Sequence, residues 1–160
     1  MEIDGKTTTI ENIMRQPVTI GNNAILHDVL KKMIAQKTNS LLVVDEDEKL
    51  VGIVNAGSVI ARVVPDYLED DTIAARFATE EMFKEEVNKS RDVSVTEFMN
   101  EQPNTVKVGS SIMEAAIFAL SKKQVRVPVV DDEYKVVGLL TRTEFKQVIG
   151  HYMGIDESFK

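Results

Sequence analysis

The sequence predicts an α/β (α+β) fold made of two pseudo-symmetric β-α-β-β-α repeats whose sheets pack on each other. Two observations predict it: the chain matches itself at a fixed offset, and each copy has the same succession of helical and extended apolar patterns. The chain has 160 residues, of which 43% are apolar. One copy alone has too small an apolar core to be stable, so we expect the two copies to bury their sheets against each other.

The internal repeat has an offset of 86 residues and keeps its register from Pro17 to Gly52. Apolar positions follow the same offset where identity is lost, so the match reflects a duplicated fold. The main identities pair Pro17 with Pro103, Thr19 with Thr105, Val43–Asp45 with Val129–Asp131, and Val51–Gly52 with Val137–Gly138.

Each copy has the same predicted elements. Apolar residues at i, i+3, i+4, i+7 and i+8 predict an amphipathic helix over Leu26–Ile34 and another over Ile112–Leu120. Short apolar runs on either side of a charged turn predict a hairpin in each copy, with a short strand before each helix. The predicted strands are Val18–Ile20, Leu41–Val44 and Leu50–Val54, then Thr105–Val108, Val127–Val130 and Val136–Leu140. A second helix follows each hairpin, over Ala56–Val63 and Arg142–Tyr152.

The stretch between the copies matches neither of them. We divide the chain into a first repeat at 10–64, an acidic helical linker at 65–92 and a second repeat at 93–152. Residues 66–86 hold eight acidic and two basic residues, which is −6 of the net charge of −7. Interspersed apolar residues and a possible N-cap at Thr79 predict one or two helical segments. The linker is either a solvated acidic surface or a docking surface for a basic partner.

Composition excludes several classes of protein. A pI near 4.9 argues against non-specific binding to nucleic acid or to an anionic membrane. The chain has no cysteine, so it has no disulfide framework and no thiolate metal site. Neither a signal peptide nor an apolar run long enough for a membrane span is present, so we expect a soluble, cytoplasmic protein.

The duplicated unit, with Pro-x-Thr near each start and Val-Val-Asp in each hairpin, resembles a tandem pair of CBS domains, also called a Bateman module. The second copy matches more closely, through Arg126–Asp131 and Gly138–Glu144. The resemblance covers the two repeats and leaves out the linker. It implies a compact module that often pairs into a disc-shaped dimer. It also implies that clefts between the repeats bind adenine nucleotides or their adenosyl relatives.

The resemblance implies a ligand site in the second copy. In the family, an acidic residue three positions after the Thr or Ser that follows the third strand commonly holds the ribose hydroxyls, and here that pair is Thr141 and Glu144, with Glu standing for Asp. Each also has an ordinary structural explanation, since Thr141 can cap the following helix and Glu144 can be a first-turn dipole residue. The other expected contacts are Thr105 and Val106 beside the base, Val127 and Pro128 along its slot, and Lys107, Arg126 and Arg142 at the phosphates.

The first copy departs from the pattern at the ligand positions. Asn55 replaces the Thr and Ser58 replaces the acid, so the charge that would hold a ribose diol is absent. We therefore expect a second, weaker site formed by Thr19, Ile20, Asn55 and Ser58.

The sequence carries no catalytic motif. It lacks a phosphate-binding Gly-rich loop and a nucleophile elbow, and Asp45–Glu48 has no Gly at the sixth position of an EF-hand loop. We therefore expect no enzyme, no metal site and no required cofactor. An enzyme that uses a nucleotide is the least favoured of the functions considered.

The expected function is a regulatory module that senses AMP, ADP, ATP or an adenosyl relative and acts on an unknown regulated protein by conformational change. The alternative is a ligand-free structural or protein-interaction module that acts through its dimer surface or acidic linker. We expect a homodimer through the helices that follow each hairpin. The apolar residues expected to need cover there are Val59, Ile60, Val63, Phe145, Val148 and Ile149.

Overall fold

The computed structural model describes residues 8–122 and 124–155, so the first seven residues, where no signal peptide is expected, lie outside it. The chain forms two compact units. Unit 1 comprises Met1–Pro17, Asp47–Leu50 and Pro103–Lys160, and unit 2 comprises Val18–Glu46 and Val51–Gln102. Each unit is built around one three-stranded sheet, and the predicted α/β class is confirmed. The packing of one sheet on the other stays a prediction.

The first repeat has the predicted β-α-β-β-α order. Its sheet has the order β1-β2-β3, and β1 runs parallel to β2 with Thr19 opposite Leu42. A parallel pair needs a crossover, which the helix between these strands supplies. The elements are β1 (Thr19–Gly21), α2 (Leu26–Ala35), β2 (Ser40–Val44), β3 (Leu50–Asn55) and α3 (Ala56–Val63).

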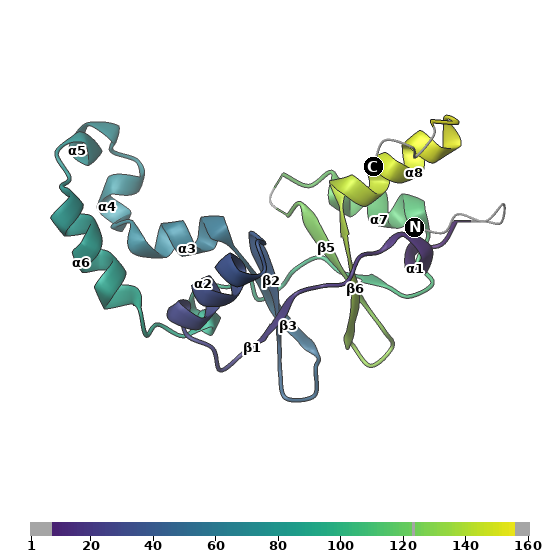
Figure 1. Ribbon diagram of the computed structural model, residues 1–160, viewed down its shortest axis with the longest axis horizontal. Helices are drawn as coiled ribbons and strands as arrows, with labels where there is room; N and C mark the ends of the chain where they lie inside the picture. Colours follow the sequence, from purple (N-terminus) through teal and green to yellow (C-terminus); the bar gives the residue numbers. More distant parts are fainter. Residues whose placement is uncertain (1–7, 123, 156–160) are drawn as a thin grey trace. The chain divides into compact units, whose positions relative to one another are not determined.

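The second repeat has the same order, preceded in unit 1 by a short helix from the start of the chain (Figure 1). Its sheet has the order β4-β5-β6, and β5 pairs antiparallel with β6, with a register shift between Val129 and Val130. The elements are α1 (Ile10–Ile13), β4 (Val106–Lys107), α7 (Ile112–Ala119), β5 (Arg126–Val130), β6 (Val136–Thr141) and α8 (Arg142–Tyr152).

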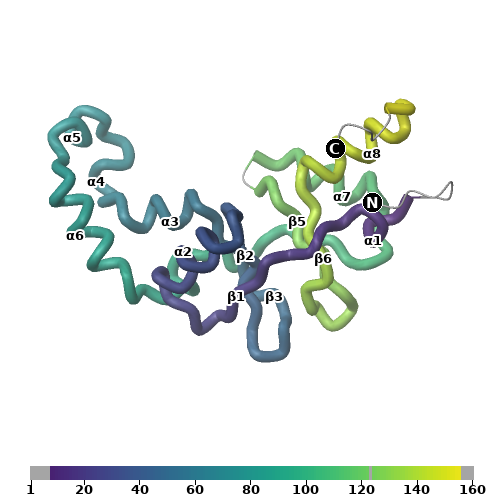
Figure 2. The backbone as a smooth tube through the Cα atoms, in the orientation of Figure 1, coloured from purple at the N-terminus to yellow at the C-terminus, as the bar shows by residue number. Residues whose placement is uncertain are grey.

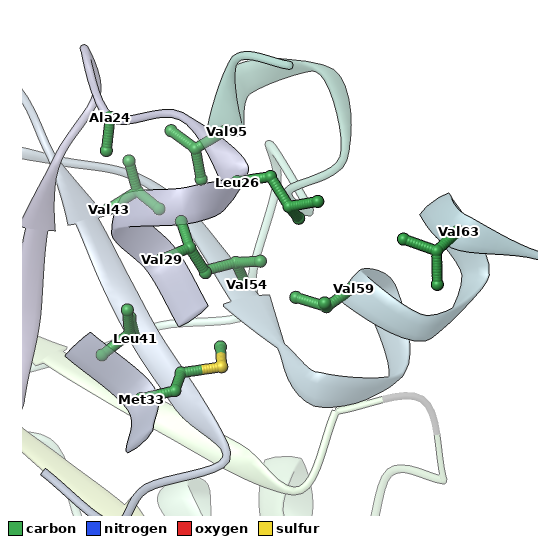
Figure 3. Close-up of a cluster of buried hydrophobic side chains, with 10 residues drawn as sticks. All are labelled: Ala24, Leu26, Val29, Met33, Leu41, Val43, Val54, Val59, Val63 and Val95. Carbon is green, nitrogen blue, oxygen red and sulfur yellow. The ribbon is translucent and has the colours of Figure 1, made fainter. Parts of the chain in front are cut away.

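Each unit has its own apolar core. In unit 2, Leu26, Val29 and Met33 of α2 pack with strand residues such as Val43 and with Val95 (Figure 3). One part of the helix prediction is wrong, because Ile34 and Leu120, the i+8 positions, are 74% and 78% exposed. Eight residues advance about 80° around a helix beyond two full turns, so the i+8 position lies at the edge of the apolar stripe.

Each sheet is completed by a segment from the start of the other repeat, before the first strand of that repeat. Figure 2 shows the N-terminal segment running beside β6, where Arg15 and Leu139 exchange two backbone hydrogen bonds of 3.0 Å. In unit 2, Asn100 and Ile53 of β3 make the same exchange, at 2.8 and 3.0 Å. The core of unit 1 accordingly includes Ile10 and Ile13, and that of unit 2 includes Val95.

A glycine in each outer strand permits this close approach. A Cβ added to Gly52 would lie 2.5 Å from the Met99 sulfur and 3.0 Å from the Asn100 carbonyl oxygen. A Cβ added to Gly138 would collide with Met14 in the same way. The absent side chains therefore make room for the crossing segments.

The linker contains three helices, where one or two helical segments were expected. They are α4 (Asp66–Glu69), α5 (Thr72–Arg76) and α6 (Glu80–Ser90). The Thr79 hydroxyl accepts a 3.2 Å hydrogen bond from the Met82 backbone N–H, so Thr79 caps α6 as predicted. The Asp71 carboxylate caps α5 by accepting from the backbone N–H groups of Ile73 and Ala74, which is how such a short helix is held.

Fewer of the apolar side chains on α3 and α8 are exposed than the sequence predicts. Val59, Val63 and Val148 are buried within their own units, and Phe145 is half-buried. Ile60 and Ile149 are exposed. The prediction was wrong for these residues because Val59 and Val63 belong to the core of unit 2 and Val148 belongs to the core of unit 1.

Candidate functional site

The predicted site residues of the second repeat are spread along the sheet of unit 1. Arg126, the first residue of β5, lies opposite Thr141, the last residue of β6. On the other side of β5, Val106 of β4 lies beside Val129, and Thr105 immediately precedes that strand. Arg126 and Thr141 therefore lie at one end of β5, whereas Lys107, beside Val130, lies at its other end.

Thr141 and Glu144 form a reciprocal cap at the start of α8. The Thr141 backbone N–H and hydroxyl donate to Glu144 Oε2 at 2.7 and 2.6 Å, and the same hydroxyl accepts from the Thr143 N–H at 3.2 Å. The structural role considered for Thr141 is therefore present. Glu144 is only 4% exposed, so its carboxylate is held inward against the cap and is not free in solvent.

Arg15 is a site residue that sequence reasoning missed. Its Nε donates to Glu144 Oε1 at 2.6 Å and its terminal nitrogen lies 2.5 Å from the same oxygen. The Arg15 side chain is 47% exposed, whereas that of Glu144 is 5% exposed. The two residues are 129 positions apart, and no local pattern in the sequence could have paired them.

The candidate phosphate partners differ in how freely they can move. Arg142 is exposed, but its Nε donates to the carbonyl oxygen of Ala119 at 3.3 Å, at the end of α7. Lys107 is exposed, and Arg126 is half-buried. Lys107 and Arg126 are thus more available than Arg142 to an anionic ligand.

The apolar residues predicted to line the base slot are deeply placed. Val106 is 2% exposed and Val127 is fully buried, and both side chains belong to the core of unit 1. Pro128 is also buried, opposite Leu139. Gln124, which sequence reasoning also missed, ties this end of the sheet together. Its amide donates to the carbonyls of Asn104 and Arg126 and accepts from the Asn104 N–H, each at 2.8 Å.

The equivalent positions of the first repeat form a neutral cap. The Asn55 side-chain oxygen accepts from the Ser58 backbone N–H at 2.9 Å and from its hydroxyl at 3.3 Å. Thr19 and Ile20 lie in β1 and are half-buried, while Asn55 is exposed. The predicted weaker site therefore offers neutral hydrogen-bonding groups at the end of β3.

A hydrogen bond within unit 1 also affects the ionisation of Glu11, near the start of the chain. Glu11 Oε1 accepts a 2.6 Å hydrogen bond from the Gly109 N–H. Burial acts to raise the pKa of Glu11. Hydrogen bonds from the backbone of Glu11 and Gly109 and from the Thr9 side chain outweigh it, and the pKa lies below its ordinary value.

Two features are absent from the described residues, 8–122 and 124–155. No group of three or more His, Cys, Asp or Glu side chains there could hold a metal ion. No helix in that part of the chain is both long and apolar enough to cross a membrane.

Comparison with known proteins identifies the repeats. The CBS domain family matches residues 10–65 and 95–151. The uncharacterized protein MJ1426 of Methanocaldococcus jannaschii is 25% identical over 160 residues, covering 93% of this chain and 95% of that protein. The chloroplastic CBS domain-containing protein CBSX2 of Arabidopsis thaliana is 27% identical over 121 residues, and the match covers 72% of this chain and 51% of that protein.

Solved structures share the fold. CBSX2 in complex with AMP has a TM-score of 0.68 and 23% identity, covering 91% of this chain and 98% of that chain. The CBS domain pair of protein MJ0100, in complex with 5-methylthioadenosine and S-adenosyl-L-methionine, has a TM-score of 0.67 and 22% identity, covering 92% and 99%. With both repeats matched, this chain belongs to the CBS domain family and carries two CBS domains in tandem.

Proposed function

We propose that this protein is a regulatory module that binds an adenine nucleotide or an adenosyl relative and does not turn it over. The main support for the proposal lies at the end of β6, where the Thr141 hydroxyl and the Arg15 guanidinium each lie within hydrogen-bond distance of the Glu144 carboxylate. A carboxylate accepts from a ribose diol, and a guanidinium binds phosphate. The ligands named for the CBSX2 and MJ0100 structures support the same class of ligand.

The hydrogen bonds of Glu144 suggest how ligand occupancy is transmitted. An ionised carboxylate offers about four acceptor sites. Arg15 supplies two nitrogens to Oε1, and Thr141 supplies an N–H and a hydroxyl to Oε2, so the four positions are taken. A ribose hydroxyl can bind Glu144 only by displacing one of these donors.

Arg15 is the donor that is displaced most readily. Its side chain is half exposed, so water can satisfy the guanidinium once it leaves, whereas the Thr141 N–H belongs to the helix cap. Release of Arg15 loosens the segment before β1. Binding at one end of unit 1 then changes the conformation of the N-terminal segment.

The other parts of the proposal concern assembly and location. The protein forms a homodimer through α3 and α8, which the exposed Ile60 and Ile149 support. It acts on a separate regulated protein, in the cytoplasm, and requires no cofactor. The domain bounds 10–64, 65–92 and 93–152 remain part of the proposal, as does the weaker site of the first repeat.

Calorimetry with AMP, ADP, ATP, 5-methylthioadenosine and S-adenosyl-L-methionine tests the site. Thr141→Val and Glu144→Ala should each weaken binding by about one to two decades, since a hydrogen bond to a charged group contributes roughly 1.5–3 kcal/mol. The matched variants Asn55→Ala and Ser58→Ala should have smaller effects. Absence of saturable binding to any of the five ligands contradicts the function. Equal losses from both repeats would show two equivalent sites, and no loss from Glu144→Ala would remove its ribose role.

The same samples test assembly and catalysis. Light scattering at micromolar concentration should give the mass of a dimer, and a monomer mass contradicts the proposed interface. Chromatography of the nucleotide after incubation should return it unchanged. Conversion of the nucleotide to a product would favour the enzyme rival.

A further inference from the structure

An apolar groove lies in unit 2, at the opposite end of α3 from Asn55 of the predicted weaker site. The end of α3 and the three linker helices enclose it, with a volume of about 180 Å³. Its walls include Val64, Leu68, Ala78, Met82 and Phe83. In Figure 1 the chain runs outward along α3, turns through α4 and α5 and returns along α6. The Ser90 hydroxyl donates to the Arg62 carbonyl at 3.4 Å, which fastens the end of α6 to α3.

Two of the side chains that line the groove are large, apolar and exposed. Phe83 is 54% exposed and Met82 is 38% exposed on the groove wall. Ile73 and Phe77, on and just after α5, are also exposed, at 68% and 79%, but they do not line the groove. Large apolar side chains gathered on one surface mark an interaction site more often than isolated ones do. Flexible Met beside Phe suits a surface that accommodates another protein's side chains.

The volume of the groove indicates the kind of occupant. Pockets for small molecules usually measure about 300 Å³ or more, whereas a cavity of about 150 Å³ holds one benzene ring. At about 180 Å³ the groove accepts one large side chain, aromatic or aliphatic. It therefore fits an anchor residue of a partner better than a whole metabolite.

The charge around the groove is strongly negative. Residues 66–86 contribute −6. Lys84 lies 3.4 Å from Glu80 and 3.7 Å from Glu81 and partly neutralises them. Among the described residues, Asp66, Glu69 and Asp70 form no ion pair. A second copy of this chain would bring an equal negative surface against the first, so the charge favours a basic partner and disfavours self-association here.

The backbone of this region favours a helical partner. Residues 65–92, all of which the structure describes, form helices and turns and include no strand. An extended peptide would find no sheet edge to pair with, whereas a helix satisfies its own backbone groups. We propose that this groove binds a basic amphipathic helix of a partner protein, which inserts one large apolar side chain beside Phe83 and sets its Lys and Arg side chains against the acidic residues of α4 and α6.

A synthetic peptide provides the probe. It has about 18 residues, long enough for helix formation, with Leu at i, i+3, i+4 and i+7 and Lys elsewhere. Fluorescence anisotropy of the labelled peptide with the full chain should give saturable binding. Two control peptides have the same composition in an order that destroys the apolar face, or Glu in place of Lys. Both should bind at least about tenfold more weakly.

Variants locate the binding on the protein. Phe83→Ser removes the apolar contact, and Ala78→Phe fills the groove without removing any side chain from it, so each should weaken peptide binding about tenfold or more. The control Ile34→Ser removes an apolar residue of α2 that is 74% exposed, more than the 54% of Phe83, and should leave binding unchanged. Glu69→Gln with Asp70→Asn should weaken binding about three- to tenfold at low salt, and this loss should shrink in high salt.

The outcomes are distinct. Weaker binding to Phe83→Ser and Ala78→Phe, with Ile34→Ser unchanged and circular dichroism intact in all three, supports the proposal. No binding of the Lys peptide overturns it, as does equal binding of the scrambled or Glu peptide. Binding that is insensitive to Ala78→Phe also overturns it. A dimer that dissociates on Phe83→Ser in light scattering would show that a second copy occupies the groove instead.

Discussion

The two repeats place different chemistry at one equivalent position. In the second repeat, Thr141 caps α8 together with a buried carboxylate, and Arg15 neutralises that carboxylate. In the first, Asn55 caps α3 through Ser58, and the crossing residue is Asn100, whose side-chain oxygen accepts from the Gln102 N–H. The helix that follows the hairpin therefore begins at charged groups in the second repeat and at neutral groups in the first. The backbone pairing of the crossing segments is therefore the same in both repeats, whereas the two sites differ in charge.

The largest loss of stability is expected when the ion pair between Arg15 and Glu144 is broken. Arg15→Met leaves the buried carboxylate of Glu144 without its cation and should lower the free energy of unfolding by about 2 kcal/mol. The matched Asn100→Met should cost well under 1 kcal/mol, because Asn100 is exposed and neutral. Urea denaturation measures both.

A double variant checks the cause of that loss. Glu144→Gln added to Arg15→Met should recover part of the stability, because the uncompensated charge is gone. If Arg15→Met is as mild as Asn100→Met, the ion pair does not stabilise unit 1 and the contrast between the repeats is only geometrical.

A smaller effect is expected from the caps themselves. Asn55→Ala removes one acceptor at the start of α3 and should cost about 1 kcal/mol. Thr141→Ala should cost somewhat more, about 1.5 kcal/mol, because its hydroxyl also donates to Glu144. Thermal melting followed by circular dichroism compares the two variants. Equal losses would mean that the bond to Glu144 adds nothing to the cap.

The smallest effect concerns pH. The folded pKa of Glu11 is lowered, so its ionised form stabilises the folded state above the ordinary Glu pKa of about 4.3, and this contribution is lost as pH falls through the folded value. Glu11→Gln should therefore cost about 0.5 kcal/mol at pH 7, a value that allows for solvent screening. The cost should disappear at acid pH, once Glu11 is protonated in the folded state as well. Urea titrations at both pH values test this, and a difference that persists in acid would contradict it.

Elements with strong local periodicity could be predicted from the sequence. The helices Ala56–Val63 and Arg142–Tyr152 have the predicted bounds, and the hairpin strands differ by about one residue at an end. These patterns depend on neighbouring residues alone. The helix α5 could not be foreseen as readily, because its five residues depend on a single capping carboxylate.

The site could be predicted only in part. Its position at the ends of the strands followed from the family resemblance, and the role of Thr141 as a cap followed from its place before a helix. The Arg15–Glu144 pair depends on a crossing of distant segments, which periodicity does not encode. Met14 and Met99 stand 85 residues apart, one fewer than the repeat offset, so the self-match that began at Pro17 did not connect them.

The exchange of crossing segments has a consequence for how this chain can be divided. A fragment that stopped at residue 64 would lack Val95, which is fully buried in the core of unit 2, and also the backbone partner of Ile53. A fragment that began at residue 93 would likewise lose Ile10, Ile13 and Arg15. Two fragments made by cutting the chain at the repeat boundaries would therefore each lack part of the core that they need to fold. A circular permutation that opened the chain within the linker would keep each crossing segment joined to the repeat that follows it, and would preserve both cores.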